Sequence, residues 1–176
     1  AGSSLGAALL GWHEYLDQPR RVDSNDSMKG TYLGNCFSNT EIISYLKSIN
    51  ATFKSLEDFE LFEKLAQLLE EGKVIGWFNG PMEFGPRALG GRSIIGDPRN
   101  QNMQSVMNLK IKYRESFRPF APSVLKENLH EWFELETDSP YMLLVGKVNK
   151  SKLLTETKEQ LLKKGIDKLD VVRSQI

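Results

Sequence analysis

The stretch EFGPRALGGRSIIGDPR, from Glu83 to Arg99, limits what this chain can fold into more than any other part of its sequence. It contains four glycines and two prolines, which interrupt helices and central strands, so only short elements can cross it. It also contains three arginines and only two acidic residues. Arginine suits neither turns nor a packed core, but its planar fork binds phosphate and carboxylate oxygens in pairs. We therefore expect a rigid turn that presents guanidinium groups to an anion.

Positive charge is concentrated in one window of an otherwise neutral chain. The 176 residues include 23 Lys and Arg and 23 Asp and Glu, which gives a formal net charge of zero. The window from Glu83 to Arg118 holds seven basic and three acidic residues, a balance of +4 that the rest of the chain must offset. Such a distribution argues against a general affinity for nucleic acid or membranes and indicates a local anion site.

The pattern of apolar residues predicts an α/β or α+β layer fold. A capping box at Ser38–Glu41 opens one helix, and Gly72 fits the end of the next. Residues 18–30 are polar and rich in breakers, so we expect a linker between two domains there. The expected helices cover residues 3–16, 38–49, 55–72, 102–109, 128–133 and much of the stretch after 155. The expected strands cover residues 73–78, which should be buried, 93–96 and 141–148, with a further strand starting near 168.

A second basic cluster lies in NLKIKYRESFRPFAP, from Asn108 to Pro122. Lys110, Lys112 and Arg114 alternate with apolar neighbours, which predicts a strand that carries all three cations on one face. Like charges held side by side repel each other, so this face would suit an anion. The alternative is a solvated edge strand protected by lysine.

Several familiar kinds of site are missing from the sequence. There is no Walker loop and no strand-linked GxGxxG, so a nucleotide would have to be held by side chains. Only two histidines occur and no HExxH or CxxC spacing, so we expect no metal site within the chain. Cys36 is the only cysteine and no apolar run reaches membrane-spanning length, which favours a cytoplasmic location without membrane attachment.

The strings GWFNGPMEFGPRALGGRSIIGDPR, NLKIKYRESFRPFAPSVL and SPYM together resemble the C-terminal domain of the carbamoyltransferase family, whose members modify nodulation factors, cephamycin and aminoglycosides. The resemblance implies a YrdC-like twisted mixed sheet flanked by helices over residues 21–176. Residues 1–20 would be the last helix of an actin/hexokinase-like N-terminal domain and the start of the linker. The domain would be truncated, and the metal and acceptor sites of the N-terminal domain would lie outside the chain. The sequence departs from the family at Gly91, where a polar residue, often Asn, is expected.

The resemblance also implies an activity. The domain would bind carbamoyl phosphate and ATP with Mg²⁺, form carbamoyl-adenylate and release pyrophosphate, and the N-terminal domain of the same protein would pass the carbamoyl group to an acceptor hydroxyl. Arg87 and Arg92 would bind carbamoyl phosphate or the adenylate, with Lys112, Arg114 and Arg118 on the ATP phosphates. Glu83 would orient an arginine or the carbamoyl amide. The other supporting residues are Gly85, Pro86 and Gly90, which shape the turn, together with Arg99, Asn108 and Ser139, the last as a partner for a phosphate oxygen.

Two further interpretations remain open on the sequence. An RNA- or nucleotide-binding module would explain why basic residues are interleaved with aromatic ones such as Phe78, Phe84 and Phe120, although the zero net charge argues against nucleic acid. A purely structural domain that docks on a partner domain would leave the arginines without a ligand.

Overall fold

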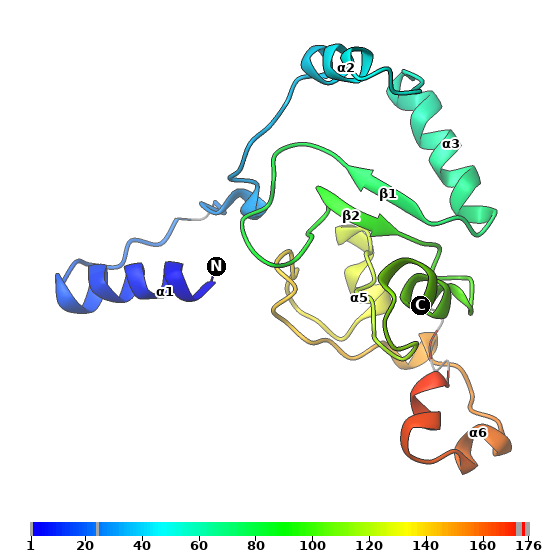
Figure 1. Cartoon of the computed structure of the whole chain (residues 1–176). Coiled ribbons are helices and arrows are strands. Elements are labelled where there is room, and N and C mark those ends of the chain that lie inside the picture. Colours follow the sequence, from blue (N-terminus) through cyan, green and yellow to red (C-terminus); the bar gives the residue numbers. More distant parts are fainter. Residues whose placement is uncertain (1, 24, 172–173, 175–176) are drawn as a thin grey trace. The chain divides into compact units, whose positions relative to one another are not determined.

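The computed structural model describes residues 2–23, 25–171 and 174 of the chain (Figure 1). The chain divides into two compact units, one made of residues 1–56 and 76–93 and the other of residues 57–75 and 94–176. The element content is α+β, as expected, with short helices and one small sheet. The only named sheet in the described residues has two strands, so the larger twisted mixed sheet is not seen there.

The first unit begins with helix α1, Gly2–Leu10, which continues as a π-helical turn, Gly11–Tyr15, close to the expected bounds. In the polar stretch that follows, the described residues form no regular element until a 3-10 turn at Lys29–Thr31. Helix α2, Asn39–Ser48, confirms the capping box. Ser38 Oγ accepts from the Glu41 N–H at 3.3 Å, and the Glu41 carboxylate accepts from the Ser38 N–H at 2.8 Å.

Strands β1, Ile75–Phe78, and β2, Arg92–Ile95, form the sheet and run in opposite directions (Figure 1). Along β1 the residues alternate between half-buried and exposed, so the prediction of a buried strand is wrong and only one face is partly covered. The loop between the strands closes on itself through a hydrogen bond from the Asn79 N–H to the Gly91 carbonyl at 2.8 Å. The glycine-rich motif therefore lies in this loop, between two strands that fix its ends.

The second unit begins with helix α3, Asp58–Glu70, which ends before Gly72 as predicted, with that glycine at φ +76°. Helix α4, Met103–Val106, continues as a π-helical segment, Met107–Lys112. Met103 and Met107 are buried and supply the centre of a small core. Gly96 lies directly against them, because a Cβ there would be 2.7 Å from Met103 Sδ.

The strand predicted over Lys110–Arg114 is wrong. Lys110 and Lys112 lie in the π-helical segment, and Arg114 follows Tyr113, which ends the helix with a left-handed φ of +50°. Residues two apart on a helix do not share a face, so the cations do not form the expected row. Five alternating residues are too few to tell a strand from a helix, and the buried pair Met103 and Met107 sets the helical register here.

The remainder of the second unit consists of short helices and loops. Its elements are a 3-10 turn Lys126–Asn128, helix α5 Leu129–Trp132, a 3-10 turn Lys150–Lys152, helix α6 Lys158–Leu162 and a 3-10 turn Gly165–Asp170. The strand predicted over 141–148 is wrong: the bridge between Phe133 and Val148 is isolated, and Val145 is 99% exposed. Apolar β-branched residues favour a strand, but a strand also needs a partner, and the described residues provide no ladder here.

The strand predicted to start near 168 is wrong over residues 168–170, which belong to the 3-10 turn Gly165–Asp170. The rest of that prediction falls partly on residues 172–173 and 175–176, which lie outside the described part of the chain. Within the described residues this end contributes an isolated bridge between Leu153 and Ser174. No helix in the described ranges combines the length and the apolar character needed to cross a membrane.

Candidate functional site

The loop from Asn79 to Arg92, called the arginine loop below, is organised around the carboxylate of Glu83. Its Oε1 accepts from the N–H of Leu89 at 3.0 Å and from the N–H of Gly91 at 2.6 Å. Partial burial raises the pKa of the Glu83 carboxyl, but these backbone N–H groups outweigh burial and hold the pKa below its ordinary value. In the structure Glu83 orders the backbone of the loop, and its expected role in orienting an arginine or a carbamoyl amide stays a prediction.

Arg92 fastens the two ends of the arginine loop together. Its guanidinium donates to the carbonyls of Asn79 at 3.0 Å, Gly80 at 3.0 Å and Gly91 at 2.8 Å. The guanidinium carbon also lies 3.4 Å from the ring centroid of Phe78, which adds a cation–π contact. Much of the hydrogen-bonding capacity of Arg92 is therefore used within the loop, although its charge remains there.

Arg87 sits at the turn of the same loop and is exposed. It follows Pro86 and Gly85, whose φ of +133° requires glycine, and it precedes Gly90 at φ +119°. No described residue forms a hydrogen bond or ion pair with its side chain. The loop thus presents one guanidinium to solvent while a second one, that of Arg92, holds its base.

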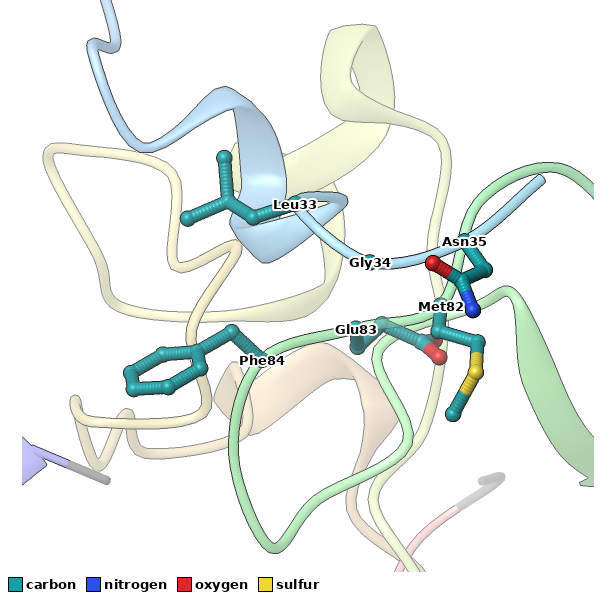
Figure 2. Close-up of a pocket in the computed structure, with 6 residues that line it drawn as sticks. All are labelled: Leu33, Gly34, Asn35, Met82, Glu83 and Phe84. Atoms are coloured by element: carbon teal, nitrogen blue, oxygen red, sulfur yellow. The ribbon is translucent and has the colours of Figure 1, made fainter.

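A segment that the sequence analysis did not connect with the site lies along the start of the arginine loop. Residues 31–35, called the Tyr32 segment below, pair with residues 82–84 through bonds of 2.7 Å from the Phe84 N–H to the Thr31 carbonyl and 2.9 Å from the Gly34 N–H to the Met82 carbonyl. The two segments line a shallow cavity of about 250 Å³ (Figure 2). Leu33 and Phe84 lie at one end of this cavity and Asn35 and Met82 at the other (Figure 2).

The available sequence signal for this pairing was Gly34. A Cβ at Gly34 would lie 2.7 Å from the Cβ of Met82, so the close approach of the two segments requires glycine. Tyr32 adds a side-chain contact, because its hydroxyl donates to the Leu89 carbonyl at 3.0 Å.

In the second unit, Asn108 organises the other basic cluster and is fully buried, with 0% exposure. Its side-chain amide donates to the carbonyls of Ser116 at 2.9 Å and Arg118 at 2.8 Å, and its side-chain oxygen accepts from Arg114 Nε at 2.6 Å. The Arg114 guanidinium carbon is 4.8 Å from the centroid of the Phe120 ring. Asn108 therefore fixes both the loop from 113 to 118 and the direction of one arginine.

The remaining candidates of this unit have different surroundings. Lys112 is exposed at the end of the π-helical segment. Arg118 Nε pairs with the Glu115 carboxylate at 3.1 Å, and the backbone N–H of Glu115 and this arginine lower the pKa of that carboxyl. Ser139 is half-buried and follows Asp138, whose carboxylate lies 2.6 Å from Lys126 Nζ.

Arg99 forms a bidentate pair with Asp97, at 3.0 Å from Nε to Oδ1 and 2.7 Å from Nη2 to Oδ2. The hydrogen bond from Arg99 lowers the pKa of the Asp97 carboxyl despite its partial burial. The positive charge of Arg99 is therefore compensated by Asp97, whereas the charge of Arg87 has no such partner among the described residues. Within the ranges 2–23, 25–171 and 174, no three His, Cys, Asp or Glu side chains are grouped so that they could hold a metal ion.

Comparison with known proteins gives the class to which these arginine turns belong. The family model described as the C-terminus of carbamoyltransferases matches residues 66–172, so the chain belongs to the carbamoyltransferase family. Over its whole length it is 57% identical to the uncharacterized protein sll1178 of Synechocystis sp., of which it covers 29%.

Two relatives have informative names. The chain is 37% identical to nodulation protein NolNO of Sinorhizobium fredii, with 86% of the chain and 22% of the relative aligned. It is also 37% identical to 3'-hydroxymethylcephem-O-carbamoyltransferase of Amycolatopsis lactamdurans, with 51% of the chain and 17% of that enzyme aligned. The chain thus spans less than a third of the length of these relatives.

Proposed function

We propose that this chain is the substrate-activating part of an O-carbamoyltransferase and binds carbamoyl phosphate and ATP. The observation that carries the proposal is the arginine loop, in which Glu83 and Arg92 hold the backbone while the guanidinium of Arg87 stays exposed. A turn whose backbone is already held needs little rearrangement when an anion binds to its exposed guanidinium, which suits phosphate and carbamate groups. The family membership supports the same class of substrate.

The proposed chemistry has two steps that balance. Water cleaves carbamoyl phosphate to carbamate and inorganic phosphate. An oxygen of carbamate then bonds to the α-phosphorus of ATP, the bond between that phosphorus and the bridging oxygen breaks, and pyrophosphate leaves with its electron pair. Carbamoyl-adenylate results, and the rest of the protein transfers the carbamoyl group to an acceptor hydroxyl. Magnesium arrives with ATP as part of the substrate.

In this scheme the protein contributes position and positive charge, because both substrates are anions that repel each other. Arg87 binds the carbamoyl phosphate or carbamate, and the charge of Arg92 lies at the base of the same loop. Lys112, Arg114 and Arg118 are assigned to the ATP phosphates, with Arg114 held in direction by Asn108. We place the reaction in the cytoplasm, where ATP is available, and assign the YrdC-like fold to the domain of the complete protein.

The test is a titration of the full-length protein with carbamoyl phosphate and with Mg²⁺-ATP, followed by Arg87→Ala. We expect the dissociation constant for carbamoyl phosphate to rise by roughly 10- to 100-fold, the factor that a lost charge-assisted hydrogen bond gives. Arg21→Ala, which removes another exposed arginine of the same unit, should leave it unchanged. Absence of carbamoyl phosphate-dependent pyrophosphate release in the folded wild type would overturn the proposed function.

A further inference from the structure

We propose that Tyr32 is a positioning residue for the anion site and that the Tyr32 segment sets the conformation of the arginine loop. This inference rests on the proposed function and extends the site to a part of the chain about fifty residues before the arginine motif. It concerns contacts within the first unit only.

The Tyr32 segment holds the arginine loop at two separate places. At the entrance of the loop, Tyr32 and Glu83 form an antiparallel bridge, flanked by the bond from the Phe84 N–H to the Thr31 carbonyl. Near the exit, the Tyr32 hydroxyl donates to the Leu89 carbonyl at 3.0 Å. Leu89 also donates its N–H to the Glu83 carboxylate. Tyr32 therefore holds the carbonyl of Leu89 and Glu83 holds its N–H, and these two residues are paired in the antiparallel bridge.

The tyrosine ring also fills the space beside the two glycines that end the turn. A Cβ at Gly91 would lie 2.8 Å from Tyr32 Cε1 and 3.0 Å from Glu83 Oε1, and a Cβ at Gly90 would lie 3.0 Å from the Tyr32 hydroxyl. Gly91, where a polar residue was expected, lies where the Tyr32 ring, the Asn79 carbonyl and the Glu83 carboxylate leave no room for a Cβ.

The backbone before Tyr32 is held in an uncommon conformation. Lys29, Gly30 and Thr31 have consecutive positive φ angles of 49°, 64° and 67°, and for a β-branched residue such as Thr31 this is a strained state. The hydroxyl of Thr31 is buried and has no hydrogen-bond partner among the described residues. Strain of this kind persists where the surrounding contacts require one geometry. Here it directs Tyr32 toward the turn that carries Arg87.

The consequence is that Tyr32 affects ligand affinity through Arg87 without contacting the ligand. Arg87 lies between Glu83 and Leu89 in the chain, and both are fixed by the Tyr32 segment. Releasing the Leu89 carbonyl lets the exposed turn sample other conformations, so an anion would have to order it on binding and its apparent affinity would fall.

The experiment uses the full-length protein with Tyr32→Phe, which removes only the hydroxyl, and Tyr45→Phe as a matched control. Tyr45 is 64% exposed on α2 in the same unit. Hydrogen exchange of peptides covering residues 83–92 is measured without ligand, and the dissociation constants of carbamoyl phosphate and Mg²⁺-ATP are measured by titration. Tyr32→Phe is expected to speed exchange in this stretch and to weaken carbamoyl phosphate about 3- to 10-fold, the factor for one lost neutral hydrogen bond. The control should change neither quantity.

The outcomes separate this inference from the proposed function. Unchanged hydrogen exchange in Tyr32→Phe would show that the Tyr32 hydroxyl does not hold the arginine loop, and would overturn the inference. Faster exchange with an unchanged dissociation constant for carbamoyl phosphate would show that this contact holds the loop without positioning the anion site, and would also overturn the inference. If the wild type binds neither carbamoyl phosphate nor Mg²⁺-ATP, the proposed function fails, and the positioning role fails with it whatever the exchange shows. A Michaelis constant for carbamoyl phosphate that rises while kcat holds would support the positioning role.

Discussion

Replacing Asn108 with alanine should destabilise the second unit by about 3 kcal/mol, at roughly 1 kcal/mol for each of the three side-chain hydrogen bonds that are lost. The Arg118 carbonyl would still accept from Gln104 Nε2 at 3.2 Å, and Arg114 can turn toward water. These two compensations are the reason to use the net value of a hydrogen bond rather than the full cost of burying unpaired groups. A loss of this size is a large share of the 5–15 kcal/mol that typically stabilises a domain.

The assay is urea denaturation of the wild type and of Asn108→Ala, followed by tryptophan fluorescence, with equal slopes as the condition for comparing midpoints. Asn102→Ala is the control, since Asn102 is exposed just before α4 and its side chain does not cap that helix, and it should change stability by less than about 0.5 kcal/mol. A loss below about 1 kcal/mol in Asn108→Ala would refute the reasoning, because the three bonds would then be worth no more than their solvated counterparts.

Two further predictions concern the arginine loop. Because the pKa of Glu83 is lowered in the folded state, its carboxylate stabilises the loop fully above the unfolded glutamate value of about 4.3, and that contribution is lost as the pH falls through the lower folded value. The difference in the free energy of unfolding between wild type and Glu83→Gln, measured in urea, should therefore be constant above pH 5 and become smaller below about pH 4. A difference that grows on acidification would contradict the lowered pKa of Glu83. Arg92→Lys should lower stability by about 1 kcal/mol in the same assay, because lysine keeps the charge but cannot reach three carbonyls or stack flat on Phe78. An unchanged midpoint would mean that charge alone suffices at position 92.

Local signals in the sequence predicted the elements whose stability is local. The capping box at Ser38 and the glycine stop at Gly72 are recognisable because their partners lie within a few residues. The same holds for the turn glycines Gly85 and Gly90, whose positive φ angles match the expected rigid turn. In each case the residue type that the backbone requires is visible without knowledge of the rest of the fold.

The features that sequence reasoning missed depend on contacts far apart in the chain. The sequence around Tyr32 does not indicate its hydrogen bond to Leu89, which is 57 residues away. The helical course of Lys110 and Lys112 is set by the burial of Met103 and Met107 rather than by the local alternation. The backbone contacts of Glu83 were also missed, because its partners are the N–H groups of Leu89 and Gly91, and a sequence does not show which backbone groups a carboxylate will accept from.

The pairing of residues 31–35 with 82–84 also bears on how this domain can be cut for study. The match to the family runs from residue 66 to 172, and a recombinant fragment with those ends would keep every arginine assigned to the site. It would nevertheless lack Tyr32 and the backbone partners of Met82 and Phe84. Such a fragment would carry the motif with its turn unsupported, so affinities measured on it would understate those of the intact protein. A fragment intended for binding studies should begin before Lys29. This start keeps the residues that form hydrogen bonds with the arginine loop, whereas the family match begins only at residue 66.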